Sequence, residues 1–215
     1  MNIVLLGYPG SGKGTQAEAL SREMNLFHIS TGDMFRDEII KGTPLGMKVR
    51  EYLESGKLVD DKTVLEIIKT KIENYKNGFL FDGFPRTYEQ AEGLDNLLAA
   101  RGHKINAVIF LRASEEEVIR RLGSRRICPK CSRVYNLVSN PPRETGKCDE
   151  CSAELVQRQD DKPEVLKKRL MVYVQLTEPL LSYYKSTNLF YEINANSAPE
   201  EITKKILDFL RAIQK

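Results

Sequence analysis

The segment that most restricts the fold lies near the amino terminus, where residues 7–13 read Gly-Tyr-Pro-Gly-Ser-Gly-Lys. An apolar, strand-like run at Asn2–Leu6 precedes it, and a helical pattern at Lys13–Met24 follows it. A glycine, four residues and Gly-Lys between a strand and a helix is the spacing of a P-loop, whose backbone N–H groups bind phosphate at a helix N-terminus. An ordinary glycine-rich turn beside a surface lysine is the alternative, and the flanking elements disfavour it. The segment therefore predicts an ATP or GTP site.

The position after the P-loop lysine departs from the general pattern. It holds Gly14, where Ser or Thr usually supplies a hydroxyl to magnesium, and the hydroxyl comes one residue later, on Thr15. We therefore expect magnesium to be held mostly by phosphate oxygens and water, which suits an ion that keeps several waters. Asp82, at the carboxyl end of a predicted strand, would act on the ion from outside its directly bound ligands, since ligands of parallel sheets bind at that edge. A turn or helix cap before Gly83 is the alternative role for Asp82.

Short β-rich runs alternate with longer helical patterns along the 215 residues. This alternation predicts an α/β fold, a P-loop NTPase-type parallel sheet with helices on both faces. The strand candidates are Asn2–Leu6, Phe27–Ser30, Phe79–Asp82, Ala107–Leu111 and Leu189–Ile193. The helix candidates are Lys13–Met24, Tyr88–Ala100, Ser114–Leu122, Pro163–Tyr184 and Pro199–Ile213.

Two regions interrupt the alternation. Residues 31–75 form a long, mostly helical insertion, and residues 127–158 are rich in turn-forming residues and hold all four cysteines. We therefore expect a core of residues 1–30, 76–126 and 159–215 with two smaller inserted domains. Mobile covers of this kind are common where a reactive phosphate must be shielded from water.

The cysteines follow the pattern Cys128-x2-Cys131-x16-Cys148-x2-Cys151, two close pairs at the spacing of a tetrahedral zinc site. With four thiolates as ligands no open position remains, so the zinc would be structural and would replace the core that so small a lobe cannot build. Two disulfides or a catalytic dithiol are the alternatives.

Composition argues against several classes of protein. The 33 basic side chains nearly balance the 30 acidic ones, for a net charge of +3, which disfavours a general binder of nucleic acid or membrane surfaces. The longest apolar runs are far below the ~18 residues that a membrane-spanning helix needs. No basic leader of a secretory signal is visible at the amino terminus. We therefore expect a cytoplasmic protein.

Several motifs, taken together and in order, resemble the adenylate kinase family, in particular its long-lid type. They cover nearly the whole chain: Tyr8–Thr15, Ser30–Arg36, Gly56–Val59, Asp82–Thr87 with Gln90, the cysteine lobe, Gln157–Asp161 and Lys168–Leu170. The family shares the glycine after the P-loop lysine, so the resemblance accounts for Gly14. It implies that residues 31–75 bind the nucleoside monophosphate and that residues 127–158 form the lid.

The resemblance also implies the side chains that bind AMP. Arg36 and Arg86 would hold its phosphate, for which the forked guanidinium suits bidentate contact. Gln90 would present a donor and an acceptor to the edge of adenine. Taken singly, a helix cap, a solvated charge or a surface amide would explain such residues equally well. The implied AMP-binding set is Thr31, Arg36, Lys57, Leu58, Val59, Gly83, Arg86, Gln90, Arg158 and Arg169.

On the ATP side the resemblance adds arginines and a late loop to the P-loop. The implied ATP-binding set is Gly10, Ser11, Gly12, Lys13, Gly14, Thr15, Arg121, Arg125, Ala195 and Ser197. The implied catalytic set is Lys13, Arg86, Arg121, Arg125, Arg158 and Arg169. These cations would neutralise two polyphosphates that meet head-on, because phosphoryl transfer needs positioning and fixed charge more than a general base. A solvated basic face is the alternative for the arginines.

Some residues near these motifs depart from the family pattern or stay outside it. Ser124 and Ala195 stand where the family usually has glycine, which could alter hinge freedom or the seat of the ATP adenine. His28 and His103 lie in no matched motif and are expected to be structural or surface residues.

The sequence thus predicts a monomeric kinase that reversibly transfers the terminal phosphoryl group of magnesium-bound ATP to AMP, giving two ADP, with ATP, AMP and ADP as partners and neither nucleic acid nor membrane. A kinase of the same fold acting on UMP or CMP is one alternative. A zinc-ribbon nucleic-acid-binding NTPase is another, although residues 126–158 hold six basic and four acidic side chains, an excess of only two. A binding module without turnover would leave the arginine set unexplained.

Overall fold

The computed structural model describes residues 1–75 and 77–214. Its strands are β1 (Ile3–Gly7), β2 (Phe27–Ser30), β3 (Phe79–Asp82), β4 (Ala107–Arg112), β5 (Arg125–Ile127), β6 (Val134–Asn136) and β7 (Phe190–Asn194). Its α-helices are α1 (Lys13–Met24), α2 (Thr31–Ile40), α3 (Pro44–Ser55), α4 (Asp61–Glu73), α5 (Tyr88–Ala99), α6 (Glu115–Gly123), α7 (Pro163–Val172), α8 (Glu178–Lys185) and α9 (Pro199–Ala212). A 3₁₀ turn, η1 (Gln159–Asp161), and a π-helical turn, η2 (Tyr173–Thr177), complete the list.

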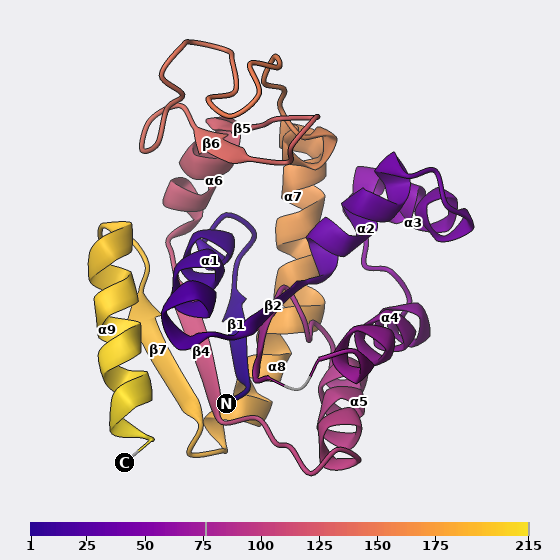
Figure 1. Cartoon of the computed structure of the whole chain (residues 1–215), viewed down its shortest axis with the longest axis vertical. Coiled ribbons are helices and arrows are strands. Elements are labelled where there is room, and N and C mark those ends of the chain that lie inside the picture. The colour runs from indigo at the N-terminus through magenta and orange to yellow at the C-terminus, as the bar shows by residue number, and fades with distance from the viewer. Residues whose placement is uncertain (76, 215) are drawn as a thin grey trace.

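Five strands form one parallel sheet in the order β2-β3-β1-β4-β7 (Figure 1). All five residues of β1 are buried, as expected for the central strand of a parallel sheet covered on both faces. Its side chains alternate between two cores: Val4 and Leu6 pack toward α4, α5 and α8, whereas Ile3 and Leu5 pack toward α1, α6 and α9. The predicted fold class is confirmed, and each of the five predicted strands lies within one residue of an observed one.

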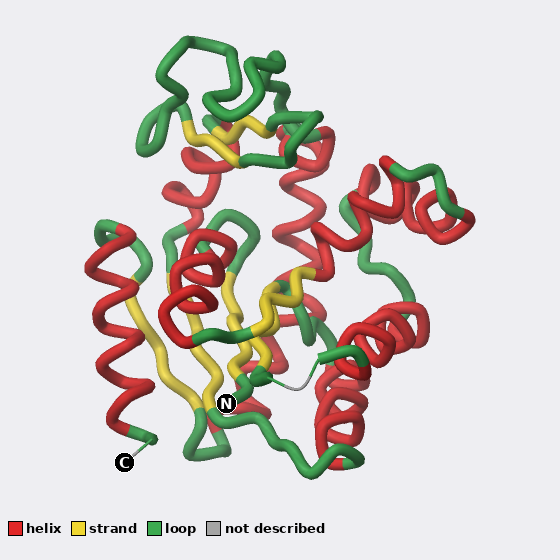
Figure 2. The backbone as a smooth tube through the Cα atoms, viewed as in Figure 1, coloured by secondary structure: helices red, strands yellow, loops and turns green. Residues whose placement is uncertain are grey.

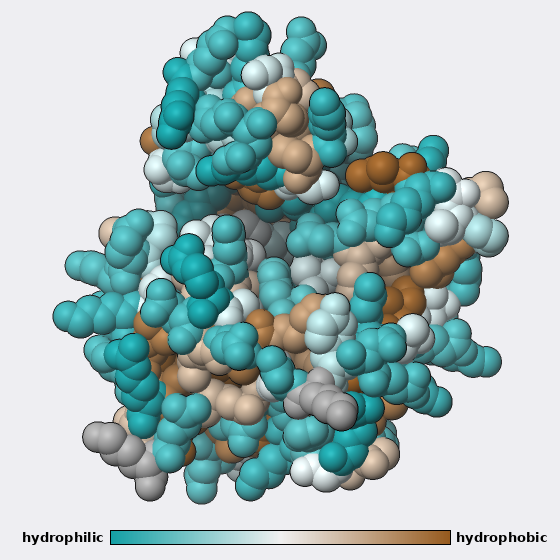
Figure 3. Space-filling view, in the orientation of Figure 1, coloured by the Kyte–Doolittle hydropathy of each residue, from teal (hydrophilic) through white to brown (hydrophobic). Residues whose placement is uncertain are grey.

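The two inserted regions differ in how they are held. Helices α2, α3 and α4 of residues 31–75 contribute Phe35, Val49 and Ile68 to one of the two cores that flank the sheet. Residues 127–158 are mostly loop and lie beyond the ends of α6 and α7 (Figure 2). Their own small cluster is built on Cys128, Tyr135 and further lobe residues. In the space-filling view the surface is hollowed between this lobe and the body of the molecule (Figure 3).

The predicted helix Pro163–Tyr184 is wrong in one respect, because the π-turn η2 interrupts it between α7 and α8. Pro179 has no N–H to donate to the preceding turn, and its ring clashes with the carbonyl four residues earlier, so a regular helix cannot continue through this point. The altered turn also lets the Thr177 hydroxyl donate a hydrogen bond to the backbone oxygen of Arg86 (3.0 Å). Within the described residues, no helix combines the length and the apolar character that crossing a membrane requires.

Candidate active site

The P-loop connects β1 to α1 at the carboxyl edge of the sheet. Gly10 and Gly12 have φ angles of +83° and +99°, a region that side chains other than glycine rarely adopt. Gly12 is the N-cap of α1 and has no side chain to satisfy the helix, so the first N–H groups of α1 are left for an anion. The Lys13 ammonium folds back onto the loop and donates to the carbonyl oxygens of Gly7 (2.7 Å) and Tyr8 (2.8 Å).

Burial lowers the pKa of Lys13 to about 7. The nearby carboxylate of Asp82 opposes this shift, and Arg86, Arg169 and Arg125 add to it by repulsion. Lysine has an ordinary pKa near 10.5, so burial, together with the nearby arginines, disfavours the charged form of this side chain more than Asp82 favours it. A phosphate ligand beside Lys13 would stabilise the charged form.

This shift predicts that ATP binding takes up protons above pH 7. The nucleotide-free protein loses the Lys13 proton as the pH rises through about 7, whereas bound phosphate would raise the pKa and restore the proton, so affinity should fall as the pH rises. Calorimetry at pH 8 in two buffers of different ionisation enthalpy should show uptake of a large fraction of one proton per chain. Lys13→Met should abolish the uptake. Proton release, or no dependence on the buffer, would contradict this prediction.

Asp82 ends β3 beside the first turn of α1. Its side chain is nearly buried, and a Cβ atom built on Gly14 would lie 3.7 Å from its Oδ2 atom. The Nε2 atom of His28 on β2 lies 3.5 Å from the same oxygen. His28, which was expected to be a structural or surface residue, therefore borders the site. The register of β2 and β3 pairs Ser30 with Asp82, and His28, two residues before Ser30, points its side chain to the same face of the sheet as Ser30.

The loop after β3 carries further candidates. The Thr31 hydroxyl and the Arg86 Nε both donate to the carbonyl oxygen of Gly83, at 3.0 and 2.7 Å. The cap of α2 is the side chain of Ser30, not Thr31, so the capping alternative for Thr31 does not apply. Gln90 is 2% exposed, and its Oε1 accepts the backbone N–H of Arg86 (2.8 Å).

Arg36 and Arg158 converge on one carboxylate, which the sequence analysis did not single out. Arg36 Nη2 donates to Asp33 Oδ1 (2.5 Å), and Arg158 Nη2 lies 3.9 Å from that oxygen. Burial works to raise the pKa of Asp33, but the two guanidinium groups and a hydrogen bond from Ser30 prevail and lower it to about 2. Burial lowers the pKa of Arg158 to about 9, with repulsion from Arg36 and Arg125 in the same direction. The three-residue spacing of Asp33 and Arg36 was the only sequence signal for this contact.

Arg125 and Arg169 share another carboxylate, which, unlike that of Asp33, is buried. Asp161 has a fully buried side chain and accepts from Arg125 Nε (2.7 Å), Arg125 Nη2 (2.5 Å) and Arg169 Nη1 (3.1 Å). Arg169 also donates to the backbone oxygen (2.8 Å) and the carboxylate (3.0 Å) of Asp160. These contacts link the base of the cysteine lobe to α7.

Arg121 joins three elements on the P-loop side. Its Nε donates to Glu117 (2.6 Å), its Nη1 to the Ser11 carbonyl (3.3 Å) and its Nη2 to the Ala195 carbonyl (2.8 Å). Arg121 thereby connects α6 to the P-loop and to the loop after β7. No hydrogen bond of the Ser197 side chain is found within the described residues.

Neither departure from the family pattern requires a glycine here. Ser124 caps the C-terminus of α6 with φ −90°, an ordinary value, and its hydroxyl donates to the Arg120 carbonyl (2.8 Å). Ala195 is fully buried and does not have a positive φ angle. Its contact with Arg121 is made by its backbone carbonyl, which an alanine supplies as well as a glycine.

The base of the helical insertion places the last AMP-side candidates between α3 and α4. The backbone N–H of Lys57 donates to the Tyr52 carbonyl (2.9 Å), Leu58 is partly buried and Val59 is buried. Gly56, just before these residues, has φ +74°, and a Cβ atom built on it would lie 3.0 Å from the Arg169 side chain. The segment Lys57–Val59 therefore begins close to Arg169.

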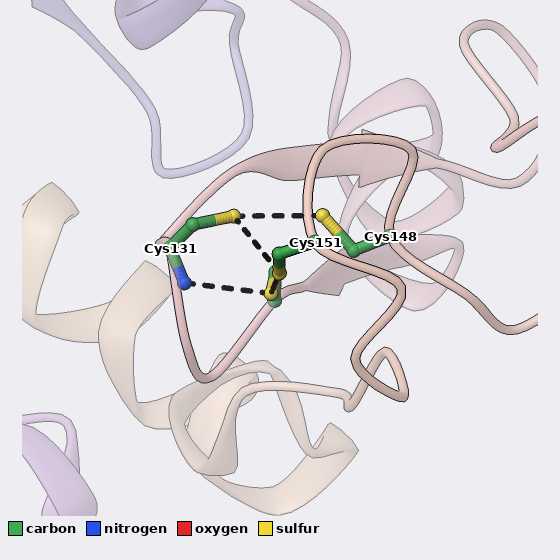
Figure 4. Close-up of side chains that lie close together, drawn as sticks. Cys131, Cys148 and Cys151 are labelled. Atoms are coloured by element: carbon green, nitrogen blue, oxygen red, sulfur yellow. Dashed lines mark hydrogen bonds between the residues drawn. The ribbon is translucent and has the colours of Figure 1, made fainter.

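The four cysteines come together as the spacing predicts. Their sulfur atoms all lie within 4.8 Å of one another, at 3.4 Å for Cys128–Cys151, 3.5 Å for Cys131–Cys148 and 3.8 Å for Cys151–Cys131. Thiolates bound to zinc at about 2.3 Å stand about 3.8 Å apart along a tetrahedron edge. Cys131, on one loop of the lobe, and Cys148 and Cys151, on another, point their side chains toward one another (Figure 4). All four are free thiols, so the disulfide alternative finds no support, and the donor set fits a structural zinc ion.

The arrangement suits the handling of phosphate. A P-loop, a carboxylate at the edge of the sheet and partly buried guanidinium groups from α2, α7 and the segments that flank the lobe face the same region. The family model for adenylate kinase matches residues 5–189 of this chain.

The chain belongs to the adenylate kinase family. A relative from Thermosipho africanus with the name adenylate kinase is 44% identical over 98% of this chain and all of its own length. Relatives of the same name from Archaeoglobus fulgidus and Methanocella arvoryzae are 45% and 46% identical over 100% and 99% of this chain and all of their own length.

Family membership confirms the activity expected from the sequence. The chain is a nucleoside monophosphate kinase with adenylate kinase function, and nothing favours the UMP/CMP kinase or the nucleic-acid-binding NTPase. The family implies ATP, AMP and ADP as substrates and magnesium as the ion used with ATP.

Proposed function

We propose that the P-loop holds ATP, that residues 31–75 hold AMP, and that the two phosphate chains meet between Lys13 and the arginine cluster, which comprises Arg36, Arg86, Arg125, Arg158 and Arg169. One observation supports this proposal: Asp82, Arg86, Arg169 and Arg125, side chains from three separate segments, lie near enough to the Lys13 ammonium to shift its pKa beside the larger effect of burial. Like charges gathered in a partly buried region are costly, and an anionic substrate between them would remove that cost.

The candidate residues divide into those proposed to bind ATP, those proposed to bind AMP and those proposed to act on the transferring phosphoryl group. Gly10–Thr15 bind ATP phosphates, with Arg121, Arg125 and the loop at Ala195 and Ser197 around the nucleotide. Arg36 and Arg86 bind the AMP phosphate, while Thr31, Gly83 and the strip Lys57–Val59 surround its nucleoside, and Gln90 reads the base. Arg158 and Arg169 stand between the substrates and stabilise the charge on the transferring group.

Release of the arginines from their carboxylates would accompany binding. Arg36 now pairs with Asp33, and Arg125 and Arg169 pair with Asp161. These ion pairs keep the guanidinium groups ordered while no phosphate is present. Phosphate oxygens that arrive in the site would then take over hydrogen bonds that the carboxylates hold now.

Two ions complete the proposal. Magnesium would neutralise charge on the ATP phosphates, and the residue placed to orient its water is Asp82, which lies beside the first turn of α1. Zinc on the four cysteines would hold residues 127–158 as a lid that closes over the phosphates. We take the core as residues 1–30, 76–126 and 159–215, of which residues 76 and 215 lie outside the described residues.

We further propose that the enzyme acts as a monomer in the cytoplasm and without nucleic acid. One chain supplies all the phosphate-binding candidates named above, so a partner subunit is not needed to complete the site. The four free thiols suit a reducing compartment.

A panel assay tests the proposal. With ATP and magnesium, kcat/KM should be at least about 100-fold higher for AMP than for UMP or CMP, because the smaller pyrimidine ring would hold its hydrogen-bonding edge out of reach of the Gln90 amide, and uracil also reverses the donor and the acceptor. Total zinc measured on the same sample should be one ion per chain. Equal use of UMP or CMP would show that the assigned base contacts are wrong.

A further inference from the structure

A hydrogen bond between Asp61 and Gln90 has no task in the proposed function. Gln90 Nε2 on α5 donates to Asp61 Oδ1 on α4 (2.7 Å), and Gln90 Oε1 accepts the backbone N–H of Arg86 (2.8 Å). The amide of Gln90 is therefore bound on both sides by protein groups.

These two partners fix which way the amide faces. A backbone N–H can only donate, and an ionised carboxylate can only accept. Rotation of the Gln90 amide by half a turn would set its oxygen against the Asp61 carboxylate and its NH₂ against the Arg86 N–H, so both hydrogen bonds would become repulsions. The amide keeps one N–H and one lone pair for a ligand, each on a fixed side.

We propose that Asp61 is a specificity-determining residue, which holds the Gln90 amide in the single orientation that fits adenine and rejects a 6-oxopurine. The edge of adenine offers an acceptor at N1 and a donor at the 6-amino group. Hypoxanthine reverses both, with a donor at N1 and an acceptor at O6. A freely rotating amide would pair with either base, whereas a locked amide pairs with one. This inference rests on the proposed contact between Gln90 and the AMP base.

The local structure leaves Asp61 free for this task. Asp60, its neighbour, caps α4 by accepting the N–H of Thr63 (2.9 Å) and also pairs with Lys48 (3.1 Å). Asp61 is the first residue of the helix and points to α5 instead. On α5 the Thr87 cap accepts the backbone N–H of Gln90 (3.1 Å), so the root of the Gln90 side chain is anchored as well.

The test compares Asp61→Asn with Asp60→Asn in the full-length enzyme. The measured quantity is the ratio of kcat/KM for AMP to kcat/KM for IMP, with magnesium-ATP as donor. An asparagine at position 61 can rotate its own amide to match either orientation of Gln90, so only the Arg86 N–H still opposes rotation. The ratio should fall about tenfold or more, the scale of a lost hydrogen bond to a charged group.

Asp60→Asn removes the same charge one residue away and keeps a good N-cap, so its ratio should match the wild type. A purely structural role for Asp61 would lower both rates together and leave the ratio unchanged. That result would refute the proposal that Asp61 fixes the orientation of the Gln90 amide. If thermal melting shows that Asp61→Asn is poorly folded, Asp61→Ser, which keeps an uncharged acceptor, replaces it with the same expected fall.

Gln90→Ala distinguishes the orienting role of Asp61 from the proposed contact between Gln90 and the base. If Gln90→Ala strongly lowers the AMP/IMP ratio while the Asp61 variants leave the ratio unchanged, only the orienting role of Asp61 is wrong. If Gln90→Ala also leaves the ratio unchanged, Gln90 does not read the base, and both ideas fail together.

Discussion

Replacement of Arg86 by alanine is expected to lower kcat by about 10³-fold or more with the fold intact. Arg86 is a buried cation whose pKa burial lowers to about 10, so it keeps its charge at neutral pH. Its Nε is tied to the Gly83 carbonyl, which leaves the other guanidinium nitrogens for phosphate. A single fixed donor to developing charge is worth about 10²–10³ in rate, and an arginine at a transferring phosphoryl group about 10³–10⁵.

Steady-state rates with saturating ATP and AMP, together with a melting curve, check this expectation. Arg86→Lys should recover only part of the rate, because a lysine keeps the charge and loses the planar fork. Arg22→Ala is the matched control, since Arg22 lies on the exposed surface of α1 and its change should leave the rate unaltered. A rate for Arg86→Ala within tenfold of the wild type would refute the assigned role.

Removal of zinc is expected to unfold the lobe of residues 127–158 before the rest of the chain and to abolish most activity. The lobe has only a small cluster of its own around Cys128, Tyr135 and Cys148, too little apolar surface for about thirty residues to fold alone. Structural zinc contributes about 10–16 kcal/mol to such folds. Without it, the lobe and the arginines at its base would lose their positions.

Hydrogen exchange before and after treatment with a strong chelator measures this effect. Amides of residues 127–158 should lose protection while those of the β1–β4 sheet keep theirs. Cys148→Ser should reproduce the loss, and Ser139→Ala, an exposed serine in the same lobe, should not. Metal analysis without zinc, or full protection of the lobe after chelation, would argue against a structural metal.

Local spacing carried the parts of the fold that were predicted well. The P-loop and the two cysteine pairs depend on residues close together in sequence, and each strand was found from its own apolar run. The five strands of the sheet accordingly lie within one residue of the prediction, and the four sulfur atoms meet.

Contacts between distant segments could not be read in this way. The Asp61–Gln90 bond spans 29 positions and the Thr177–Arg86 bond spans 91, so each depends on how α4, α5 and η2 pack. A pair of adjacent aspartates, Asp60 and Asp61, gives no sign of which one caps the helix and which one turns to another element. The sequence holds one signal for the interruption, Pro179, which a helix prediction based on apolar spacing alone does not take into account.

In the proposed complex, two nucleotides lie with their phosphates facing each other between the P-loop and the arginines of α2, α7 and the β3–α5 loop. A crystal structure with two adenosines joined by five phosphates tests it most directly. We predict one adenosine on the Arg121–Ala195 side, the other beside Gln90, and the phosphate chain in contact with Lys13, Arg36 and Arg86. A structure in which the phosphates bypass Lys13, or in which Arg36 and Arg86 stay paired only with protein groups, would contradict the account.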